Sequence, residues 1–367
     1  MREVEAEAEE PLAAGDRARA WWQKPMLDWK VWIGLGVTAV AIGVTLRGVD
    51  LREVGRALAS ANPFWLLLMM PINVLALWSR SVRWRYLTGS LRDGGLPIGA
   101  LFRATAVGFM TINILPLRIG ELARPWLLAR ETGVRGSAAI GTVVIERAID
   151  FTTIALIGAG VLFFHTQALP AWVRSGAFVF AIIACIPFAM VVGLRLREEA
   201  TLAVLARIVG LLPQNAGAQV LDVVQELCRG ITALKGARSM FMVAVHSALL
   251  WGLITPAPFL LALFAFRIEL APGDAILAMY TSMVFTALAV AAPSAPGFLG
   301  VYHFACREAL NLFGISSAIA VAYGTAAHLC YWVPTTLVGL YCAVQTGARL
   351  ADLADADVGK ATSSPHR

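Results

Sequence analysis

Charged residues are scarce in this sequence, and that scarcity excludes a soluble globular protein. Only 15% of the 367 residues are Asp, Glu, Lys or Arg, and 58% are hydrophobic. A soluble protein has about 25% charged and about 45–50% apolar residues. The sequence therefore predicts an all-α, polytopic helical membrane protein, because apolar helices satisfy their backbone hydrogen bonds without water.

Cysteine pairs and the common cofactor motifs are also missing. The five cysteines are scattered without a Cys-x-x-Cys pair, so neither a disulfide framework nor a zinc site is expected. No Gly-x-x-x-x-Gly-Lys-Ser/Thr loop occurs, which removes the usual sign of ATP as an energy source. The net charge of +6 lies in short segments between apolar runs, which does not favour nucleic-acid binding. We therefore expect no cofactor, no metal and no nucleic-acid partner.

The N-terminus lacks the short basic start of a secretory signal peptide. Residues 1–28 are instead acidic and then basic, and their composition predicts a polar, disordered segment. The first apolar run, Trp29–Leu46, is then an uncleaved anchor. Its basic flank predicts a cytoplasmic N-terminus for a multi-pass protein of the cell membrane.

Further apolar runs follow, and their lengths predict about 7–9 membrane segments in all. Together they form one predicted membrane domain over residues 29–345, with a polar tail at 346–367. The runs after the first are Pro63–Trp78, Ile98–Leu117, Ala138–Phe164, Gly176–Leu194, Met240–Phe266, Ala275–Ala292 and Ala318–Val344. Residues 195–238 are interpreted either as amphipathic cytoplasmic helices or as a plain helical connector. Arg80 and Arg83, which follow the second run, are placed in a cytoplasmic loop.

Charged residues reappear where they are costly, inside or beside two of these runs. On insertion scales a charge at the membrane centre costs about 3 kcal/mol, so it rarely persists without a role. The charged residues are Arg118, Glu121, Arg124, Glu146, Arg147 and Asp150. The last three share an arc of about 100° on a helix, which predicts a polar stripe facing the interior of the bundle.

A proline at the end of the third run would bring these charges together. Pro116 lacks an N–H group, so the chain is expected to break there, close to Asn113, and to turn back as a re-entrant element. Unwound backbone inside a membrane is tolerated only against protein or a water-filled cavity, so a polar cavity is implied. A helix that starts near Pro116 would point its N-terminal amides into that cavity, where an anion binds well.

A second interrupted segment lies between the last two runs. The positions interpreted as breaks or helix starts in the two segments are Pro116, Gly120, Pro296, Gly297 and Gly300. Each segment has a proline followed four residues later by a glycine, and a nearly constant offset pairs Arg147 with His328. We therefore expect an internal repeat with two broken or re-entrant helices. Such interruptions at matching positions of two halves point to a transporter binding site.

The charged residues could bind the headgroup of a lipid. Arginine holds a phosphate in a fork geometry that lysine cannot match. The carboxylates would orient the arginines, and because the six charges balance, a zwitterionic or amine-bearing headgroup would suit them. Substrate binding is predicted for these six residues together with Asn113, His303 and His328. The alternative interpretation is an internal salt-bridge network that only holds two helices together.

These residues also resemble the motifs of a known family. The resemblance rests on Asn113-Ile-Leu-Pro116-x-Arg118-x-Gly120-Glu121-x-x-Arg124, then Gly133, Glu146-Arg147-x-x-Asp150, and later Pro296-Gly297-x-x-Gly300 before Gly314. This pattern is similar to the lysylphosphatidylglycerol synthase transmembrane (flippase-like) family and covers about residues 30–345. The resemblance implies a membrane protein that moves a lipid or lipid-linked headgroup between leaflets. The aminoacyl transferase domain is not expected in residues 345–367.

The second motif departs from the family pattern at three positions. The family often has a second glycine, a glutamate and, in the following helix, an arginine, where this chain has Phe298, His303 and His328. Because histidine titrates near neutral pH, protonation could tune the second half of the molecule.

The expected function is the transfer of a phospholipid or a polyprenyl-phosphate lipid between leaflets. Two other classes stay open. One is an accessory or scaffold protein in an envelope-lipid pathway, with envelope-lipid biosynthetic enzymes as partners. The other is an intramembrane enzyme that acts on a lipid-linked substrate. The sequence contains no recognisable catalytic constellation, so enzymatic activity is not expected.

Overall fold

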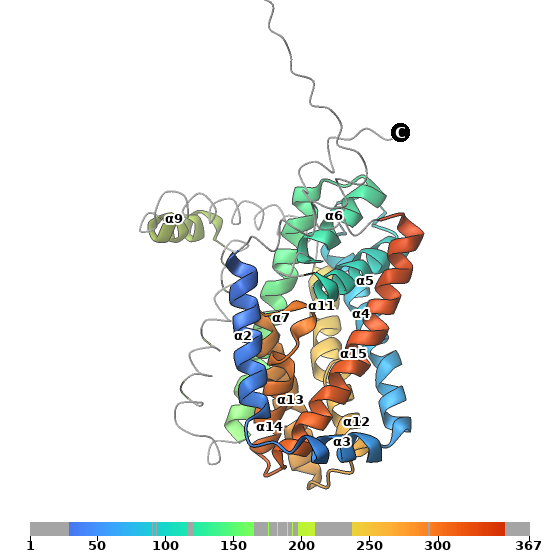
Figure 1. Ribbon diagram of the computed structural model, residues 1–367. Helices are drawn as coiled ribbons and strands as arrows, with labels where there is room; N and C mark the ends of the chain where they lie inside the picture. Colours follow the sequence, from blue (N-terminus) through green and yellow to red (C-terminus); the bar gives the residue numbers. More distant parts are fainter. Residues whose placement is uncertain are drawn as a thin grey trace, which may run out of the picture.

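The computed structural model describes residues 29–89, 91–92, 94–115, 120–164, 197–209, 237–292 and 294–348, and the single positions 175, 182, 189 and 193 (Figure 1). All regular secondary structure in this part of the chain is helical, which confirms the all-α prediction. Some predictions fall outside the described residues. These concern segment 1–28, most of the run Gly176–Leu194, the connector between residues 210 and 236, the tail beyond residue 348, Pro116 and Arg118.

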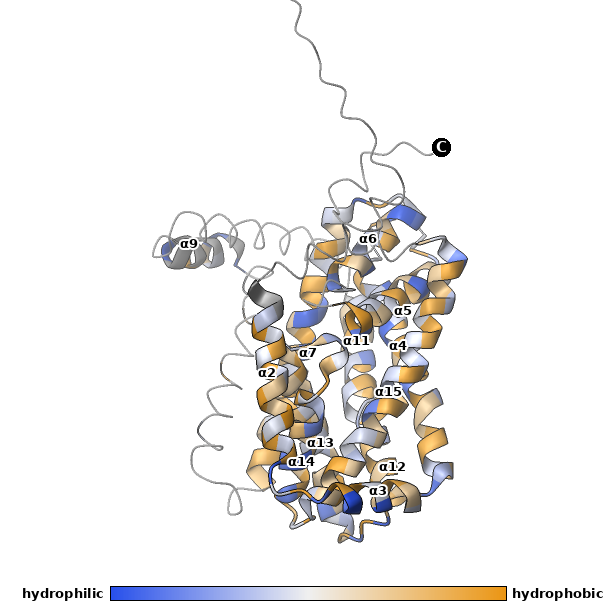
Figure 2. Cartoon of the chain, in the orientation of Figure 1, coloured by the Kyte–Doolittle hydropathy of each residue, from blue (hydrophilic) through white to orange (hydrophobic). Residues whose placement is uncertain are grey.

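The described helices follow one another along most of the chain. They are α2 (Trp29–Leu46), α3 (Leu51–Ser60), α4 (Pro63–Leu87), α5 (Ile98–Ile114), α6 (Gly120–Thr132), α7 (Gly136–Phe164), α9 (Glu198–Val209), α11 (Ala237–Leu249), η2 (Leu250–Ile254), α12 (Ala257–Ala265), α13 (Pro272–Ala291), η3 (Pro296–Phe298), α14 (Val301–Asn311) and α15 (Ser317–Thr346). Five of them, with α11, η2 and α12 taken as one, are long and apolar enough to cross a membrane, or six if the bent pair α2 and α3 counts as one span. Figure 2 shows hydrophobic residues along α2, α12 and α15, and hydrophilic ones near α3 and α6 at opposite ends. The chain is thus a polytopic helical membrane protein.

Helix α4 is longer than the sequence predicted. It continues to Leu87, whereas the predicted segment ended at Trp78. Arg80 and Arg83 are therefore buried within a helix, and the prediction that placed them in a cytoplasmic loop is wrong. The buried residues that recur at three- and four-residue spacing through this region are Leu77, Arg80, Trp84 and Leu87. This spacing continues the inward-facing stripe of the helix past the end of the apolar run.

The stretch that carries the first motif folds as a hairpin of two short helices. α5 ends at Ile114 and α6 begins at Gly120, so the helix stops just before the proline that predicted a break. The two helices pack closely, because a Cβ atom added to Gly108 of α5 would lie only 2.9 Å from the Cβ of Arg124 in α6. The turn back expected from the sequence is present, and both outer ends of the hairpin lie at the same end of the bundle (Figure 1).

A second hairpin of the same kind follows later in the chain. α13 leads into the short η3 turn, and α14 begins directly after Gly300. Gly297 and Gly300 have φ angles of +68° and +82°, which glycine adopts without the steric cost that other residues meet. These glycines lie in the interruption that the sequence predicted, and α14 begins at Val301, directly after Gly300.

The two hairpins belong to an internal repeat. Each is followed by a glycine with a φ angle of +72°, Gly133 or Gly314, and then by a long helix, α7 with 29 residues or α15 with 30 residues. The order α5, α6, α7 is therefore repeated by α13, α14, α15. The long helices α7 and α15 run in opposite directions through the bundle (Figure 1), so the repeat is inverted.

The closed ends of the two hairpins meet inside the bundle. The Asn113 carbonyl at the end of α5 accepts a hydrogen bond from the Trp332 indole of α15 at 3.3 Å, and a Cβ on Gly297 would lie 3.1 Å from the same oxygen. The Asn113 side chain donates to the hydroxyls of Thr335 and Thr336 at 3.1 and 3.0 Å. The interrupted backbone of the first half is therefore held by residues of the second half.

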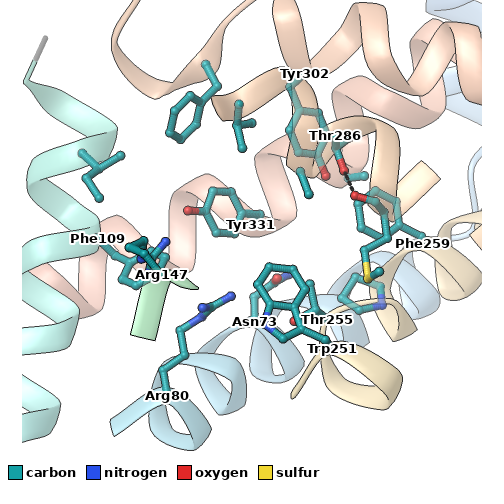
Figure 3. A pocket seen from close by; sticks show the side chains of 17 residues that line it. Asn73, Arg80, Phe109, Arg147, Trp251, Thr255, Phe259, Thr286, Tyr302 and Tyr331 are labelled. Atoms are coloured by element: carbon teal, nitrogen blue, oxygen red, sulfur yellow. Dashed lines mark hydrogen bonds between the residues drawn. The ribbon is translucent and has the colours of Figure 1, made fainter. Parts of the chain in front are cut away.

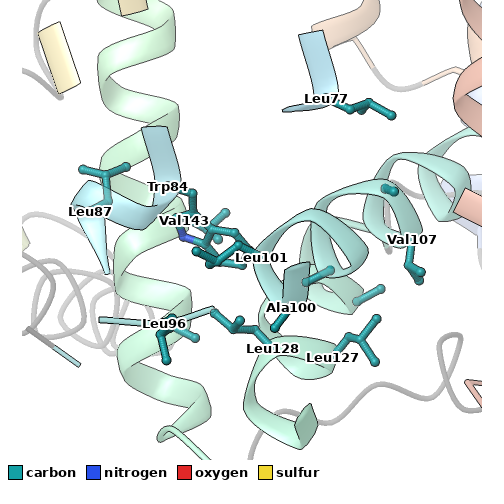
Figure 4. Packing of buried hydrophobic residues seen from close by; sticks show 14 of the residues in the cluster. Leu77, Trp84, Leu87, Leu96, Ala100, Leu101, Val107, Leu127, Leu128 and Val143 are labelled. Atoms are coloured by element: carbon teal, nitrogen blue, oxygen red, sulfur yellow. The ribbon is translucent and has the colours of Figure 1, made fainter. Parts of the chain in front are cut away.

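Apolar packing holds the first hairpin against its neighbours (Figure 4). Leu77 and Trp84 of α4 belong to one buried cluster with Leu101 of α5, Leu128 of α6 and Val143 of α7. Because lipid tails are as apolar as these side chains, close packing rather than escape from water favours the cluster inside a membrane. The cluster fixes α4, α6 and α7 relative to one another.

A short amphipathic helix lies across one end of the bundle. α3 is bent by 84° from α2 and packs against α15. Val54 is buried beside Ala318 and Val321, whereas Arg52 and Arg56 are exposed. This helix was not predicted from the sequence. Its amphipathic character is typical of a helix at a membrane–water interface.

Candidate functional site

Six charged side chains form a network where α4, α6 and α7 meet. They are Arg80, Arg83, Arg124, Glu146, Arg147 and Asp150. The members on α7 begin 10 residues after its first residue, Gly136, which at about 1.5 Å per residue is about 15–20 Å along the helix. The network therefore lies well inside the length of α7, which is long and apolar enough to cross a hydrocarbon layer about 30 Å thick.

Glu146 is the fully buried centre of this network. Its Oε1 atom lies 2.9 Å from Arg124 Nη1, 3.0 Å from Arg83 Nη2 and 3.7 Å from Arg147 Nη2. The side chains of Glu146 and Arg83 are both 0% exposed. A buried charge is tolerated only when it is paired and hydrogen-bonded, so Glu146 joins the three helices only while its arginines are present.

Asp150 is the second carboxylate of the network. Its Oδ1 atom accepts hydrogen bonds from Arg83 Nη1 at 2.6 Å and from Trp251 Nε1 at 2.7 Å. Its Oδ2 atom lies 3.5 Å from both Arg80 Nη1 and Arg147 Nη2, which is long for a hydrogen bond. Arg80 and Arg147 are thus held more loosely than Arg83.

Arg124 is fixed by an aromatic ring as well as by Glu146. Its guanidinium carbon lies 3.8 Å from the centre of the Trp84 ring, which is a cation–π contact. The Trp84 indole in turn donates to the Thr142 hydroxyl at 2.8 Å. Gly108 on the facing helix leaves the space that the Arg124 side chain occupies. The position of Arg124 therefore follows from packing between α4, α5, α6 and α7.

A π-helical turn positions Trp251 over the network. The turn, η2, includes Gly252, whose α-helical hydrogen-bond partner would be Pro256. Because proline has no N–H group, the Gly252 carbonyl loses that partner and accepts instead from the Tyr280 hydroxyl at 2.7 Å. π-helical turns are frequent at functional sites because they change the direction of a side chain.

A cavity of about 180 Å³ opens beside the network (Figure 3). Arg80 and Arg147 bound one side of it, and the remaining lining is neutral. The neutral polar residues of the lining are Asn73, Thr255, Thr286, Tyr302 and Tyr331. Ile112, next to the closed end of the first hairpin, and Phe298, in that of the second, also line it. A water needs about 10–15 Å³ of such space, so the cavity has room for several waters or a small headgroup.

The two histidines of the second motif lie beside Tyr302, and neither is among the described residues that line the cavity. His328 is stacked on the Tyr302 ring, whereas His303 meets His328 edge-to-face. The ring centroids of Tyr302 and His328 are 4.8 Å apart, and those of His303 and His328 are 5.2 Å apart. His328 Nε2 lies 2.7 Å from the Gly297 carbonyl. Because a carbonyl only accepts, Nε2 carries the proton and donates. The histidines therefore support the second break, and protonation control remains a prediction.

The structure brings together a part of the predicted site. The predicted residues that meet in the network are Arg124, Glu146, Arg147 and Asp150. Glu121 is half-buried and interacts electrostatically with Arg147. Arg118 lies outside the described residues. Asn113 and the histidines lie instead where the closed ends of the hairpins meet.

Three residues of the site were not predicted: Arg80, Arg83 and Trp251. The first two had a readable signal, since they stand three residues apart on a helical stripe that Trp84 continues. Trp251 had no such signal, because its direction depends on the π-helical turn.

The charge balance of the network favours an anion. Four arginines face two carboxylates, and Glu121 offsets only part of this excess. Arg124 Nη2 and Arg147 Nε have no hydrogen-bond partner in the described part of the chain. Within that part there is also no group of three or more His, Cys, Asp or Glu residues that could hold a metal ion. The arrangement can hold an anionic group through arginine N–H donors.

Comparison with known proteins assigns the chain to a family. Residues 31–339 match the family model described as the lysylphosphatidylglycerol synthase TM region. No curated protein and no solved structure matches the chain. The match covers the helices from α2 to most of α15, including both hairpins. With its inverted hairpins, its buried arginines and this match, the chain belongs to the lysylphosphatidylglycerol synthase TM-region family, a family of membrane proteins in lipid-related pathways.

Proposed function

We propose that this protein moves a lipid, or a lipid-linked headgroup, between the two leaflets of a cell membrane. The observation that carries the proposal is the meeting of two inverted, interrupted hairpins beside a charged cavity. In transporters built from inverted repeats, substrates bind near the bilayer midplane where discontinuous helices meet. The family supports a lipid as the class of substrate.

The cavity offers a polar headgroup a substitute for water. A polar group that enters hydrocarbon without hydrogen bonds loses roughly 2–7 kcal/mol, which is why lipids cross slowly without help. Arg80 and Arg147 supply donors on one side, whereas Met283 and Val290 give an apolar wall on which the start of an acyl chain can lie. Rocking of the two halves about their meeting point would open the cavity to each leaflet in turn.

The distribution of arginines suggests the orientation of the bundle. The arginines at the end where the first hairpin opens are Arg85, Arg92, Arg130, Arg135 and Arg238. At the opposite end, near α3 and the start of α13, each arginine is offset by an acidic residue. The arginines there are Arg47, Arg52, Arg56, Arg267 and Arg307, and the acidic residues are Asp50, Glu53, Glu269, Asp274 and Glu308. Because cytoplasmic ends carry an excess of basic residues, we place the first end in the cytoplasm. α2 begins at that end, which gives a cytoplasmic N-terminus.

Leaflet accessibility in proteoliposomes tests the proposed function. A lipid with a dye-labelled headgroup is bleached by a reductant that cannot cross the membrane. With the wild-type protein, the inner-leaflet fraction should become reactive. An Arg80→Gln, Arg147→Gln double variant should lose most of this exchange. Arg103→Gln should retain it, because Arg103 pairs with Glu131 at 2.7 Å outside the cavity.

Two outcomes would count against this proposal. If the double variant exchanges lipid as fast as the wild type, the cavity takes no part in transport. If folded wild-type protein exchanges no lipid of any class, the accessory or scaffold role becomes the better explanation.

A further inference from the structure

The cavity presents positive charge to a ligand and no negative charge. Of the described residues that line it, two are charged, and both are arginines, Arg80 and Arg147. Their side chains are 9% and 28% exposed. Each lies 3.5 Å from Asp150, so neither is tied down by a short ion pair. Both can turn toward an anionic group without breaking a strong contact.

The carboxylates of the network are paired with arginines, and neither is among the described residues that line the cavity. Glu146 is fully buried: one of its oxygens is shared by Arg83 and Arg124, and the other is buried without a hydrogen-bond partner in the described part of the chain. The Oδ1 atom of Asp150 accepts hydrogen bonds from Arg83 and from the Trp251 indole. An ammonium group could reach either carboxylate only by displacing an arginine. The displaced arginine would then be left unpaired inside the membrane, which is strongly unfavourable.

The aromatic faces next to the arginines already hold a cation. The Arg80 guanidinium lies 5.3 Å from the centre of the Phe109 ring and 5.0 Å from that of Trp251 (Figure 3). Aromatic faces of this kind recognise ammonium ligands through the same cation–π attraction. Here Arg80 occupies the position that such a ligand would take.

We propose that the cavity selects lipids whose headgroup carries a net negative charge at phosphate and no ammonium group. This inference rests on the proposed function, in that a lipid headgroup enters the cavity. The hydroxyls of Thr255, Tyr302 and Tyr331 would meet an uncharged polyol or sugar beyond the phosphate. The expectation of a zwitterionic or amine-bearing headgroup assumed balanced charges, and Arg80 and Arg83 add two positive charges to that count. The selected class also differs from the lysylated lipid in the family's name.

Equilibrium binding of a lipid panel tests the selectivity. The full chain is incubated in detergent micelles with phosphatidylglycerol, a polyprenyl phosphate, phosphatidylethanolamine and lysyl-phosphatidylglycerol, and bound lipid is measured by native mass spectrometry. At least one of the two anionic lipids should bind about tenfold more tightly than the other two lipids, because their ammonium groups are repelled by Arg80 and Arg147 and meet no carboxylate among the described residues that line the cavity. Whichever of the two anionic lipids binds more tightly shows whether the phosphate belongs to a phospholipid or to a polyprenyl phosphate. Equal or tighter binding of an ammonium-bearing lipid would overturn the inference.

A variant series connects the selectivity to the cavity. Arg80→Gln should weaken binding of the anionic lipid about tenfold and that of phosphatidylethanolamine less, because the variant also removes the repulsion of the ammonium group. Arg147→Gln should act in the same direction, which keeps the test decisive if one variant does not fold. Arg103→Gln is the control and should bind as the wild type does. Unchanged selectivity in both cavity variants would also overturn the inference.

The binding and exchange assays can fail separately. Selective binding without leaflet exchange would leave the selectivity standing and remove the proposed transport. Leaflet exchange without selective binding would leave the proposed transport standing and remove the selectivity.

Discussion

Replacing Glu146 by glutamine should destabilise the fold strongly, although the two side chains have nearly the same shape. In the wild type a single oxygen of Glu146 lies 2.9 Å from Arg124 and 3.0 Å from Arg83. Arg83 also pairs with Asp150, whereas Glu146 is the only described carboxylate that pairs with Arg124. Glu146→Gln therefore leaves the Arg124 guanidinium buried without a counter-charge.

The magnitude follows from the buried ion pairs of Glu146. Its pair with Arg124 is a hydrogen bond to a charged group, which contributes about 1.5–3 kcal/mol. Removing one partner of a buried ion pair costs about 3–5 kcal/mol, and we take this as the expected loss because the pair with Arg83 is lost as well. Glu131→Gln is the control, because Glu131 pairs with Arg103 through two hydrogen bonds at a site where the two side chains are 15% and 35% exposed. A pair that water can reach contributes about 1 kcal/mol, so this control should lose much less stability than Glu146→Gln.

The free energy of unfolding can be measured through thiol reactivity in mixed micelles with increasing SDS. Cys306, Cys330 and Cys342 are buried and become reactive only on unfolding. Cys185 and Cys228 lie outside the described residues and are replaced by serine in all variants. If Glu146→Gln is no more destabilising than Glu131→Gln, the reasoning from the buried ion pairs is refuted.

A double variant separates the ion pair from other effects of the substitution. Adding Arg124→Gln to Glu146→Gln removes the unpaired charge, so the double variant should be less destabilised than the sum of the single variants. Additive losses would show that the two side chains are not coupled.

Three further predictions concern the backbone and the orientation. Gly300→Ala should lower the free energy of unfolding by about 1–3 kcal/mol, because Gly300 has a φ angle of +82° and an added Cβ would contact α2. Gly43→Ala is the control and should be neutral or slightly stabilising, since a Cβ there has open space around it. Equal effects of the two variants would contradict this prediction. Tyr280→Phe should lower the free energy of unfolding by about 1–3 kcal/mol in the same assay, because it leaves the Gly252 carbonyl of the π-helical turn unpaired. An unchanged free energy of unfolding would show that water replaces the hydroxyl. Single cysteines at Arg135 and Asp274 should react with a membrane-impermeant reagent from opposite sides of the membrane, and labelling from one side would refute the inverted arrangement.

The two hairpins could be predicted because their signals are local. Proline removes a backbone donor, and glycine adopts positive φ angles, so Pro296, Gly297 and Gly300 mark a break whatever surrounds them. The same applies to Gly133 and Gly314, which carry matching φ angles after each hairpin. Local backbone chemistry thus gave the positions of the interruptions and the repeat.

The arginines of α4 could not be placed by a rule about apolar runs. The positive-inside rule assigns basic residues after a run to a cytoplasmic loop, and Arg80 and Arg83 follow such a run. Their burial depends on Asp150, which lies 70 and 67 residues away in the sequence. A helical stripe could have suggested that the two arginines face inward. It could not have named the partner, because pairing is decided by how α4 and α7 pack.

The position of Trp251 depends on the fold in the same way. Its indole reaches Asp150 because η2 changes the direction of the helix, and the carbonyl released at Pro256 is satisfied by Tyr280 from α13. Pro256 has no N–H group, so the sequence alone shows that one carbonyl loses its partner, but the residue that satisfies this carbonyl cannot be identified from the sequence. The aromatic side of the site therefore belongs to tertiary structure.

The repeat has the same backbone in both halves but different side chains, and this difference shapes the cavity. Arg147 and His328 occupy equivalent positions on α7 and α15, counted from Gly133 and Gly314. Arg147 lines the cavity and can contact a ligand, whereas His328 donates to the Gly297 carbonyl and supports the second break. If both halves carried the charge, a headgroup would meet arginines on both sides and could bind in either orientation. Under the proposed function, charge on one half only would direct the phosphate to α4 and α7, and the rest of the headgroup to the neutral residues of the other half.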